Sequence, residues 1–389
     1  MKLFFYSIVF LLSVFILTAC GTTSIQSGDL ADNRPEIITI NLEECLNSPE
    51  GTLQIEIDTF RIFTLNNSEA FADGYRIEEI YGDTIVVMNN SVANVYKLPE
   101  CELLESVSRS GTGDDEYSHI SDATLPVSGE RGVIITNGSR KTDTEILRHY
   151  DNDNNMTRSV TTPLYGDIRK ESDSTYIATN WLGFTGGQRK LYRLDSRFER
   201  IDSVNLPEYM EPQDAYFYLD CPIKCDGKSL CVFLNDTIYT LSENYDAIPR
   251  IAIDCGSKHM PDTIVAKRFR TREEFLEAQK PYIDLKYIDK CDDYLISTYV
   301  YNNNTYKTIF DAESGDVVWT NKSESDAGYG IEWNINGVTV SAVPHITWNG
   351  NLVLELEAED MSRIYGKPTE NAGVALLPLD TLKSKFPKS

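Results

Sequence analysis

The chain has 389 residues, of which 60 are acidic and 36 basic, and its formal net charge is −24 at pH 7. So acidic a chain is repelled by polyanions, which excludes nucleic acid as a partner and argues against docking of the protein surface on anionic lipid. A hydrophobic fraction of 41%, with 22 Tyr and 15 Phe, excludes a disordered chain.

The N-terminus has the pattern of a secretory signal peptide. Lys2 precedes an apolar stretch over residues 3–17, and the small residues Thr18 and Ala19 then lead to Cys20. The apolar stretch is too short to cross a bilayer comfortably, so the pattern favours a cleaved signal peptide over a membrane helix. We therefore predict a signal peptide over residues 1–19.

The segment Leu17-Thr18-Ala19-Cys20 resembles the lipobox of bacterial lipoproteins, in which the cysteine becomes the lipidated first residue. The resemblance implies that acyl chains such as palmitate on Cys20 anchor the protein to the outer membrane. An ordinary signal peptide with an incidental cysteine is the alternative. The small polar residues that follow predict a flexible tether over residues 20–35. They lack the acidic run that resembles a surface-export signal, which favours a periplasm-facing protein.

Residues 36–389 have the texture of a β-protein. Short runs rich in Ile, Val, Tyr and Thr are bounded by Asp, Asn, Gly and Ser, and a strand–turn–strand unit recurs six times. The first strands of the six units lie at 83–87, 131–135, 174–178, 228–232, 293–297 and 350–354. Such a unit buries its faces only against its neighbours, which predicts an all-β fold: a six-bladed β-propeller of four-stranded antiparallel blades. Two unrelated β domains are the alternative.

Two further features complete the predicted fold. Spare strands at 37–40 and 60–65 would close the ring, so we predict that N-terminal strand material completes the last blade beside Leu352–Leu356. One short helical insertion is predicted over residues 272–279, because Thr271 can cap it and Pro281 stops it.

The cysteines permit more than one arrangement. Cys20 aside, seven remain, and Cys221, Cys225 and Cys231 form the one dense cluster. Their spacing lacks the paired Cys-x2-Cys units of a zinc site. A local disulfide within the cluster and buried free thiols both remain open.

The chain resembles the six-bladed β-propeller lipoproteins of Bacteroides-type bacteria, whose propellers are TolB- or NHL-like. The resemblance rests on the lipobox, on the strand Ile38-x-Ile40 and on the loop over 108–117, which reads SRSGTGDDEY. The family has a GxGPGEY loop there, so Asp114 and Asp115 replace its Pro-Gly. The resemblance implies a propeller in the cell envelope and brings no catalytic residues.

The chemistry-bearing residues do not form a recognisable active site. Four histidines (119, 149, 259 and 345) lie outside metalloprotease and nucleophile-elbow motifs, and we expect His149 on a strand surface. The stretch over 151–155 starts like a calcium loop, but Met156 and Thr162 break the pattern, so it predicts a hairpin tip. We predict no catalytic residue, no metal and no cofactor.

Five residues are candidate ligand-binding residues. Trp181 and Phe184 lie among glycines and could form a platform for a sugar ring or a peptide, although core packing explains Trp181 equally well. Arg109, Tyr117 and His119 lie in and beside the loop over 108–117.

The predicted function is that of an envelope lipoprotein whose propeller is a non-catalytic ligand- or protein-binding module, with a protein, peptide or glycan as partner. One alternative is a propeller hydrolase or lyase with a metal in the central channel. The other is a structural subunit of an outer-membrane complex.

Overall fold

A computed structural model of the chain describes residues 37–47, 55–56, 60–65, 74–127, 129–139, 144–163, 165–180, 190–205, 224–225, 230–234, 237–242, 244, 246–324, 330–342 and 344–385. Residues 37–389 form one compact unit. The predicted signal peptide, Cys20 and the whole of the predicted tether lie outside the described residues, as do Trp181 and Phe184. None of the described helices is long and apolar enough to cross a membrane.

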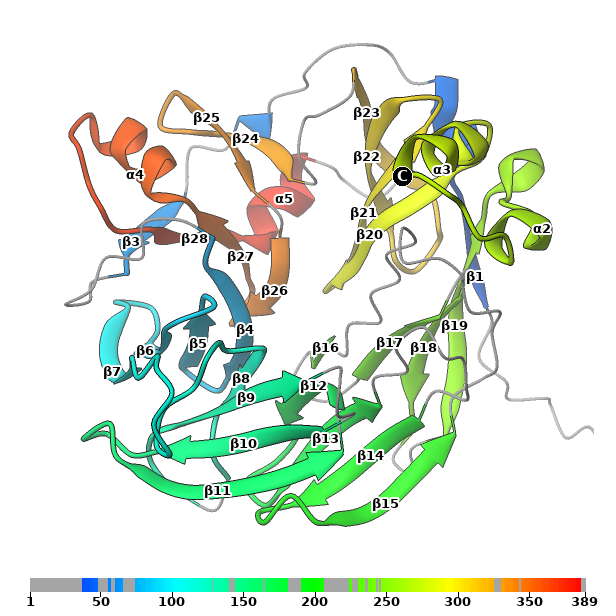
Figure 1. Cartoon of the computed structure of the whole chain (residues 1–389). Coiled ribbons are helices and arrows are strands. Elements are labelled where there is room, and N and C mark those ends of the chain that lie inside the picture. Colours follow the sequence, from blue (N-terminus) through cyan, green and yellow to red (C-terminus); the bar gives the residue numbers. More distant parts are fainter. Residues whose placement is uncertain are drawn as a thin grey trace, which may run out of the picture. The chain divides into compact units, whose positions relative to one another are not determined.

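Most of the described strands form six antiparallel sheets, which we number blades 1 to 6 in chain order (Figure 1). Blade 1 contains β4 (Arg76–Tyr81), β5 (Thr84–Met88), β6 (Ala93–Lys97) and β7 (Glu102–Val107). Blade 2 contains β8 (Asp122–Thr124), β9 (Val133–Ser139), β10 (Thr144–Tyr150) and β11 (Met156–Pro163). Blade 3 contains β12 (Tyr165–Lys170), β13 (Thr175–Asn180), β14 (Lys190–Asp195) and β15 (Arg200–Asn205).

The second half of the chain repeats this plan. Blade 4 contains β16 (Lys224–Cys225), β17 (Leu230–Leu234), β18 (Thr237–Leu241) and β19 (Ala247–Asp254). Blade 5 contains β20 (Asp284–Cys291), β21 (Tyr294–Tyr301), β22 (Asn304–Asp311) and β23 (Val317–Glu324). Blade 6 contains β26 (Pro344–Trp348), β27 (Asn351–Leu356), β28 (Gly373–Pro378) and β3 (Arg61–Thr64). The prediction of a six-bladed propeller is confirmed, and the six repeated first strands of the sequence are the second strands of the blades.

The ring closes through an N-terminal strand. β3 pairs antiparallel with β28, which in turn pairs with β27. The last blade is therefore completed by N-terminal material as predicted, although the direct neighbour is β28 and not Leu352–Leu356. The earlier strand β1 (Ile38–Asn41) goes elsewhere, because it adds to blade 4 as a fifth strand parallel to β19.

The core lies between blades. Each blade packs on both of its faces, so its middle strands are apolar at consecutive positions and not only at alternate ones. In β5, Ile85 and Val87 face the seam with blade 6, whereas Val86 and Met88 face the seam with blade 2. A side chain on either face of a middle strand is therefore buried, whatever its position in the alternation.

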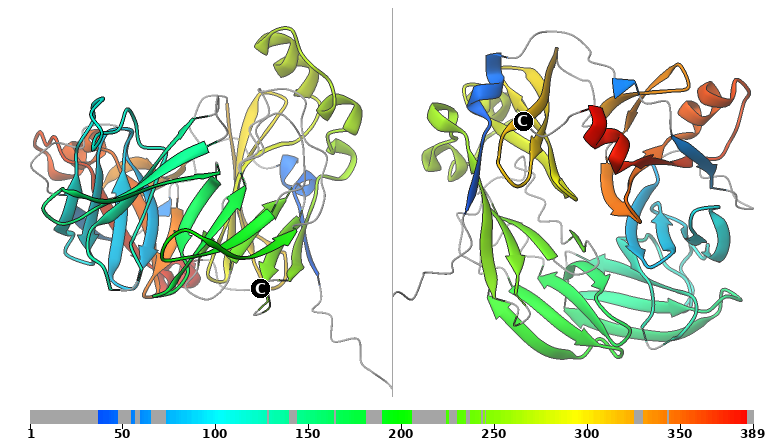
Figure 2. Two further views of the ribbon diagram at one scale, coloured as in Figure 1. Left: turned by 60° about the horizontal axis from the view of Figure 1, so that its bottom comes forward. Right: turned by 180° about the vertical axis from the view of Figure 1, so that it is seen from behind.

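The remaining helices, 3-10 turns and strands lie outside the six blades. The predicted helix is α3 (Arg272–Gln279), and Thr271 caps it by accepting a hydrogen bond from the Glu274 amide at 3.2 Å. The structure adds 3-10 turns η1 (Glu43–Asn47) and η2 (Gly256–Lys258) and helices α2 (Asp262–Val265), α4 (Ala358–Tyr365) and α5 (Leu379–Lys385). β2 (Ile55–Glu56), β24 (Ile331–Ile335) and β25 (Val338–Ala342) form a small seventh sheet. Figure 2 shows that α2 and α3 project beyond the blades.

Candidate functional site

Carboxylates connect the innermost strands of successive blades. The first strands β4, β8 and β12 lie side by side, and each has one edge without a strand partner. Side chains from the preceding blade bind the backbone N–H groups on these edges. Glu355 of blade 6 accepts from the Ile77 amide of blade 1. Asp122 of blade 2 accepts from the Ile168 amide of blade 3 at 2.9 Å.

Glu79 makes the most extensive of these contacts. Its Oε2 accepts hydrogen bonds from the Thr124 hydroxyl at 2.8 Å and the Leu125 amide at 2.9 Å, both in blade 2. Its Oε1 accepts from the Lys170 amide of blade 3 at 2.6 Å. The side chain is fully buried, so one carboxylate joins three blades in a medium of low dielectric.

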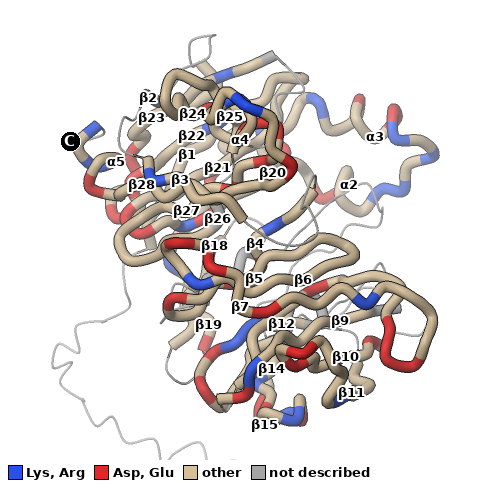
Figure 3. The backbone as a smooth tube through the Cα atoms, turned by 90° about the vertical axis from the view of Figure 1, so that its left-hand side faces the viewer, with Lys and Arg blue, Asp and Glu red and all other residues tan. Residues whose placement is uncertain are grey.

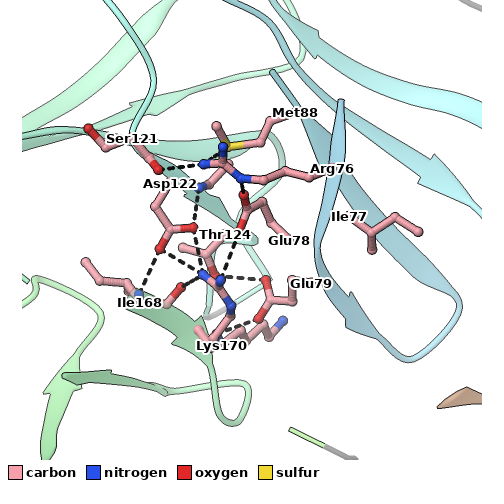
Figure 4. A network of polar contacts seen from close by, with 12 residues as sticks. Arg76, Ile77, Glu78, Glu79, Met88, Ser121, Asp122, Thr124, Ile168 and Lys170 are labelled. Atoms are coloured by element: carbon pink, nitrogen blue, oxygen red, sulfur yellow. Dashed lines mark hydrogen bonds and ion pairs between the residues drawn. The ribbon is translucent and has the colours of Figure 1, made fainter. Parts of the chain in front are cut away.

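Arg169 holds the second half of this cluster (Figure 4). Its Nη1 donates to both carboxylate oxygens of Asp122, at 2.7 and 2.8 Å, and its Nη2 donates to Glu78 at 2.9 Å. Arg76 also pairs with Glu78, and it donates to the Ser121 carbonyl oxygen at 2.8 Å. The Glu78 and Asp122 side chains are each only 7% exposed. We call Arg76, Glu78, Glu79, Asp122 and Arg169 the inner clasp.

Burial raises the pKa of both glutamates of the inner clasp. It raises the pKa of Glu78 to about 7, and the charge of Asp122 adds to the rise while Arg169 and Arg76 oppose it. Burial also raises the pKa of Glu79, although the hydrogen bond from the Leu125 amide opposes the shift. The clasp therefore contains one carboxyl group, Glu78, whose pKa lies near neutral pH and which pairs with arginines of blades 1 and 3.

A separate cavity of about 400 Å³ lies in blade 2, towards blade 3. It is lined by residues of the turn before β9, the end of β10, the hairpin tip and the start of β11: Glu130, Arg131, His149, Asp151, Asn152, Thr157 and Arg158. A β-bulge between His149 and Tyr150 breaks the register of β10 with β11 and shapes this end of the blade. We call this feature the seam cavity.

His149 is one of the residues that line the seam cavity. The expectation of a strand-surface imidazole was wrong, because its side chain is only 8% exposed. Nε2 lies 2.8 Å from the Arg131 carbonyl oxygen, which can only accept, so Nε2 carries a proton. Nδ1 lies 2.9 Å from the Thr157 hydroxyl. Neighbouring blades cover both faces of blade 2. His149 is therefore buried, although the same strand position would be exposed in a sheet that is covered on one face only.

Charges of both signs surround His149. The Arg158 guanidinium lies over the Phe198 ring of blade 3, 5.1 Å from its centroid, and its Nη2 is 3.5 Å from Glu130 Oε2. The Asp151 carboxylate accepts from the amides of Asp153 and Asn155, which confirms the predicted hairpin tip. The Asn155 amide is the main reason why the pKa of Asp151 is lowered. The cavity thus offers cationic, anionic and neutral polar groups to a ligand.

The described candidate residues from the sequence lie elsewhere. The Tyr117 side chain is 1% exposed, and its hydroxyl accepts from the Arg109 amide at 2.9 Å and donates to the Ser91 carbonyl oxygen at 2.7 Å. The Arg109 guanidinium pairs with Asp115. His119 Nδ1 lies 3.1 Å from the Ser118 hydroxyl. The structure therefore joins Arg109 with Tyr117 at the blade 1–blade 2 seam, with His119 in a separate exposed cluster.

Sequence reasoning missed the inner clasp and most of the seam cavity. The sequence does contain a pattern that could have predicted the inner clasp. Two charged residues are adjacent inside a short β run at Glu78-Glu79 and again at Arg169-Lys170. Charged pairs of this kind are costly in a strand unless they are paired. Among the described residues, no group of three His, Cys, Asp or Glu side chains is placed to hold a metal ion. Cys45, Cys101 and Cys291 are buried and Cys255 is partly exposed, while the cluster at 221, 225 and 231 has no described side chain.

These features define a six-bladed β-propeller whose inner strands are joined by buried carboxylates and which carries a polar cavity in its second blade. The chain belongs to the family described as a domain of unknown function, DUF4934, whose family model matches residues 37–377. A search of the curated proteins finds no match.

One solved structure of a Bacteroides protein shows the same fold. A putative exported protein from Bacteroides fragilis superposes with a TM-score of 0.59 at 14% identity, over 88% of this chain and 99% of that one. A member of the DUF4221 family from Bacteroides vulgatus gives a TM-score of 0.46 at 9% identity, over 82% of this chain and 96% of that one. At 14% identity the likeness to the Bacteroides fragilis protein shows the fold alone.

Proposed function

We propose that the protein is an envelope lipoprotein whose propeller is a non-catalytic binding module. In this proposal, acylated Cys20 holds the protein at the outer membrane and the propeller faces the periplasm. The lipobox-like segment supports the anchor, and the putative exported protein of the same fold is consistent with an envelope location. The TolB- or NHL-like character of the propeller is part of the same proposal.

The seam cavity carries the binding part of the proposal. A volume of about 400 Å³ accommodates a small polar molecule or a few residues of a partner. Its lining presents two guanidinium groups, two carboxylates, an imidazole, a hydroxyl and an amide. Such a mixture favours recognition of a polar ligand through several directed hydrogen bonds over burial of an apolar one.

Labelling tests the anchor. Cells that express the protein are grown with radioactive palmitate, and their membranes are separated. We expect label on the membrane-bound wild type and none on Cys20→Ala, while Cys255→Ser keeps the label because that cysteine lies inside the propeller. An unlabelled wild type, or a labelled Cys20→Ala, would contradict the anchor. Protease added to intact cells tests the periplasmic orientation, since a surface-exposed propeller would be cleaved.

Glycan and peptide arrays test the binding module. The mature protein is compared with Arg158→Gln in the cavity, with Trp181→Ala at the loop predicted from sequence, and with Arg200→Gln as a control. Arg200 lies over the Tyr192 ring at 3.9 Å, so the control removes a similar cation–π contact outside the cavity. Binding lost only in Arg158→Gln supports the cavity, and binding lost only in Trp181→Ala moves the site to that loop. No ligand on any array contradicts a ligand-binding module.

A further inference from the structure

The insertion between β19 and β20 carries an excess of positive charge, whereas the protein as a whole is acidic. It contains η2, α2 and α3, and the stretch from Lys267 to Arg272 holds four cations in six residues without an acidic one. Figure 3 shows these cations next to α3 on a protein that is otherwise rich in acidic residues. The net charge of the whole chain, −24, does not reveal this local excess of cations.

Three of these cations form no ion pair with the residues that the structure describes. Arg268, Arg270 and Arg272 are exposed, and none of their guanidinium groups forms a hydrogen bond or an ion pair with a described residue. Lys267, in contrast, pairs with Glu274 at 3.1 Å. The arginines therefore contribute little to the fold and stay available to something outside it.

Packing directs the arginines outward. Phe269 is buried and meets the buried Phe275 ring edge-on at 5.4 Å. Because Phe269 points inward, its neighbours Arg268 and Arg270 remain on the outside. Two aromatic side chains thus fix the stretch at a defined place on the insertion.

The position of the arginines is unfavourable for the helix itself. Arg272 is the first residue of α3, where the helix dipole disfavours a cation. Four residues further on, the same helix face presents Leu276, which is 43% exposed. Cations beside an exposed leucine on a projecting segment are the combination that binds a membrane interface, with the cations on headgroup phosphates and the apolar chain among the lipids.

We propose that the α2–α3 insertion is a second membrane contact, in which Arg268, Arg270 and Arg272 bind the phosphates of anionic phospholipids and Leu276 enters the interface. This inference rests on the proposed anchor at Cys20, which keeps the propeller near a membrane. The 17 residues from Cys20 to Glu36 span at most about 60 Å, enough to let the insertion reach the surface. At physiological salt, charges more than about 8 Å away are screened, so the acidic body beyond the insertion does not cancel the patch. Within the insertion, Glu273 and Glu274 interact with Arg272 and Arg270, but residues 255–283 still hold six cations against four acidic residues.

Vesicle sedimentation tests the contact. The unit of residues 37–389 is used, because it is compact and its ring closes within itself. We expect binding to vesicles of phosphatidylglycerol and phosphatidylethanolamine that weakens with salt, and little binding to phosphatidylcholine. The triple variant Arg268→Gln, Arg270→Gln, Arg272→Gln should lower the partition coefficient by roughly 100-fold, about 5-fold for each arginine. Leu276→Ser should lower it several-fold.

A matched control separates the patch from net charge. Lys97→Gln, Arg197→Gln and Lys367→Gln remove the same charge at exposed sites outside the insertion and should leave binding nearly unchanged. Equal binding to both vesicle types, or an unaffected Arg triple variant, would overturn the inference. So would self-association at low salt that requires the arginines, since the patch would then bind a second copy. This unit lacks Cys20, so its result is independent of whether palmitate labelling succeeds.

Discussion

The Glu79 carboxylate of blade 1 accepts a hydrogen bond of 2.6 Å from the Lys170 backbone amide of blade 3. This contact passes over the inner strand of blade 2, whose Thr124 hydroxyl and Leu125 amide bind the other oxygen of the same carboxylate. Adjacent blades of a propeller share no backbone ladder at their inner edges, so side chains must satisfy the exposed N–H groups there. Glu79 does this for two blades at once.

Removal of this carboxylate should destabilise the ring. Glu79→Ala leaves the donors at Thr124, Leu125 and Lys170 buried without an acceptor, and we expect a loss of roughly 3–5 kcal/mol in the free energy of unfolding. Urea unfolding followed by circular dichroism measures it. Glu102→Ala, on the exposed edge of β7, is the control and should change stability by less than about 0.5 kcal/mol. A Glu79→Ala protein as stable as this control would show that water replaces the carboxylate.

The pKa of Glu78 predicts a pH dependence of stability. The unfolded chain has a carboxyl pKa near 4.5, and burial raises that of the folded protein to about 7. Between these values the folded protein binds a proton that the unfolded chain releases. Stability therefore falls as pH rises from about 4.5 to about 7 and is then constant, by an amount on the order of 3 kcal/mol.

Denaturant unfolding at pH 5, 6, 7 and 8 checks this dependence. Glu78→Gln has no charge to titrate, so its curve should lack this part of the decline, and the difference between the two proteins isolates the one residue. Glu102→Gln serves as the control and should follow the wild type. Parallel curves for wild type and Glu78→Gln would mean that Glu78 is ionised throughout this range.

Closure of the ring by β3 should be needed for full stability. Phe63 pairs with Val374 of β28, and because the Leu65 amide two positions away donates to the Ala372 carbonyl oxygen, the Phe63 N–H also points at β28. A proline at position 63 removes this donor and distorts the outer strand of blade 6. We expect Phe63→Pro to lower the free energy of unfolding by about 3 kcal/mol, visible as a lower melting temperature. Ile37→Pro, at an exposed position before β1, should have a small effect. Equal effects of the two prolines would argue against closure through β3.

Two glycines beside the seam cavity should differ sharply in their tolerance of alanine. Gly132 has a φ of +110°, and a Cβ there would lie 1.8 Å from the Tyr150 carbonyl oxygen. Gly129 has a φ of +71°, but nothing lies within 4 Å of its Cβ position. We expect Gly132→Ala to cost more than about 3 kcal/mol and Gly129→Ala about 1 kcal/mol. Thermal unfolding decides, and similar melting temperatures would contradict the close approach of β10 to this turn.

The periodicity of the sequence located much of the fold correctly. Each repeated run, from 83–87 to 350–354, coincides with the second strand of a blade, because a strand buried between two neighbours needs consecutive apolar residues. The cap at Thr271 was also readable, since a capping side chain and its amide are three residues apart. The sequence analysis did not predict helix α4. The helix has few buried positions, such as Met361, and so it lacks a long apolar periodicity.

Local sequence patterns did not predict the inner clasp or the seam cavity. The partners of Glu79 are 45, 46 and 91 residues away in the chain, and local pattern carries no information about which strand edges meet. His149 was misread for the same reason, because its burial depends on blade 3 and on the turn at Arg131. The cationic stretch from Lys267 to Arg272 was visible in the sequence, but the exposure of Arg268, Arg270 and Arg272 was not.

The amino-acid sequence by itself determined the β-rich repeat, the count of six blades and the place of the helical insertion, because strand alternation, turns and caps depend on residues close together in the chain. Only the tertiary structure decided that β1 joins blade 4 while β3 closes blade 6, that buried carboxylates join the inner strands, and that a cavity forms beside His149. Those features arise where blades meet, and contacts between blades depend on the geometry of the closed ring, which no single repeat contains.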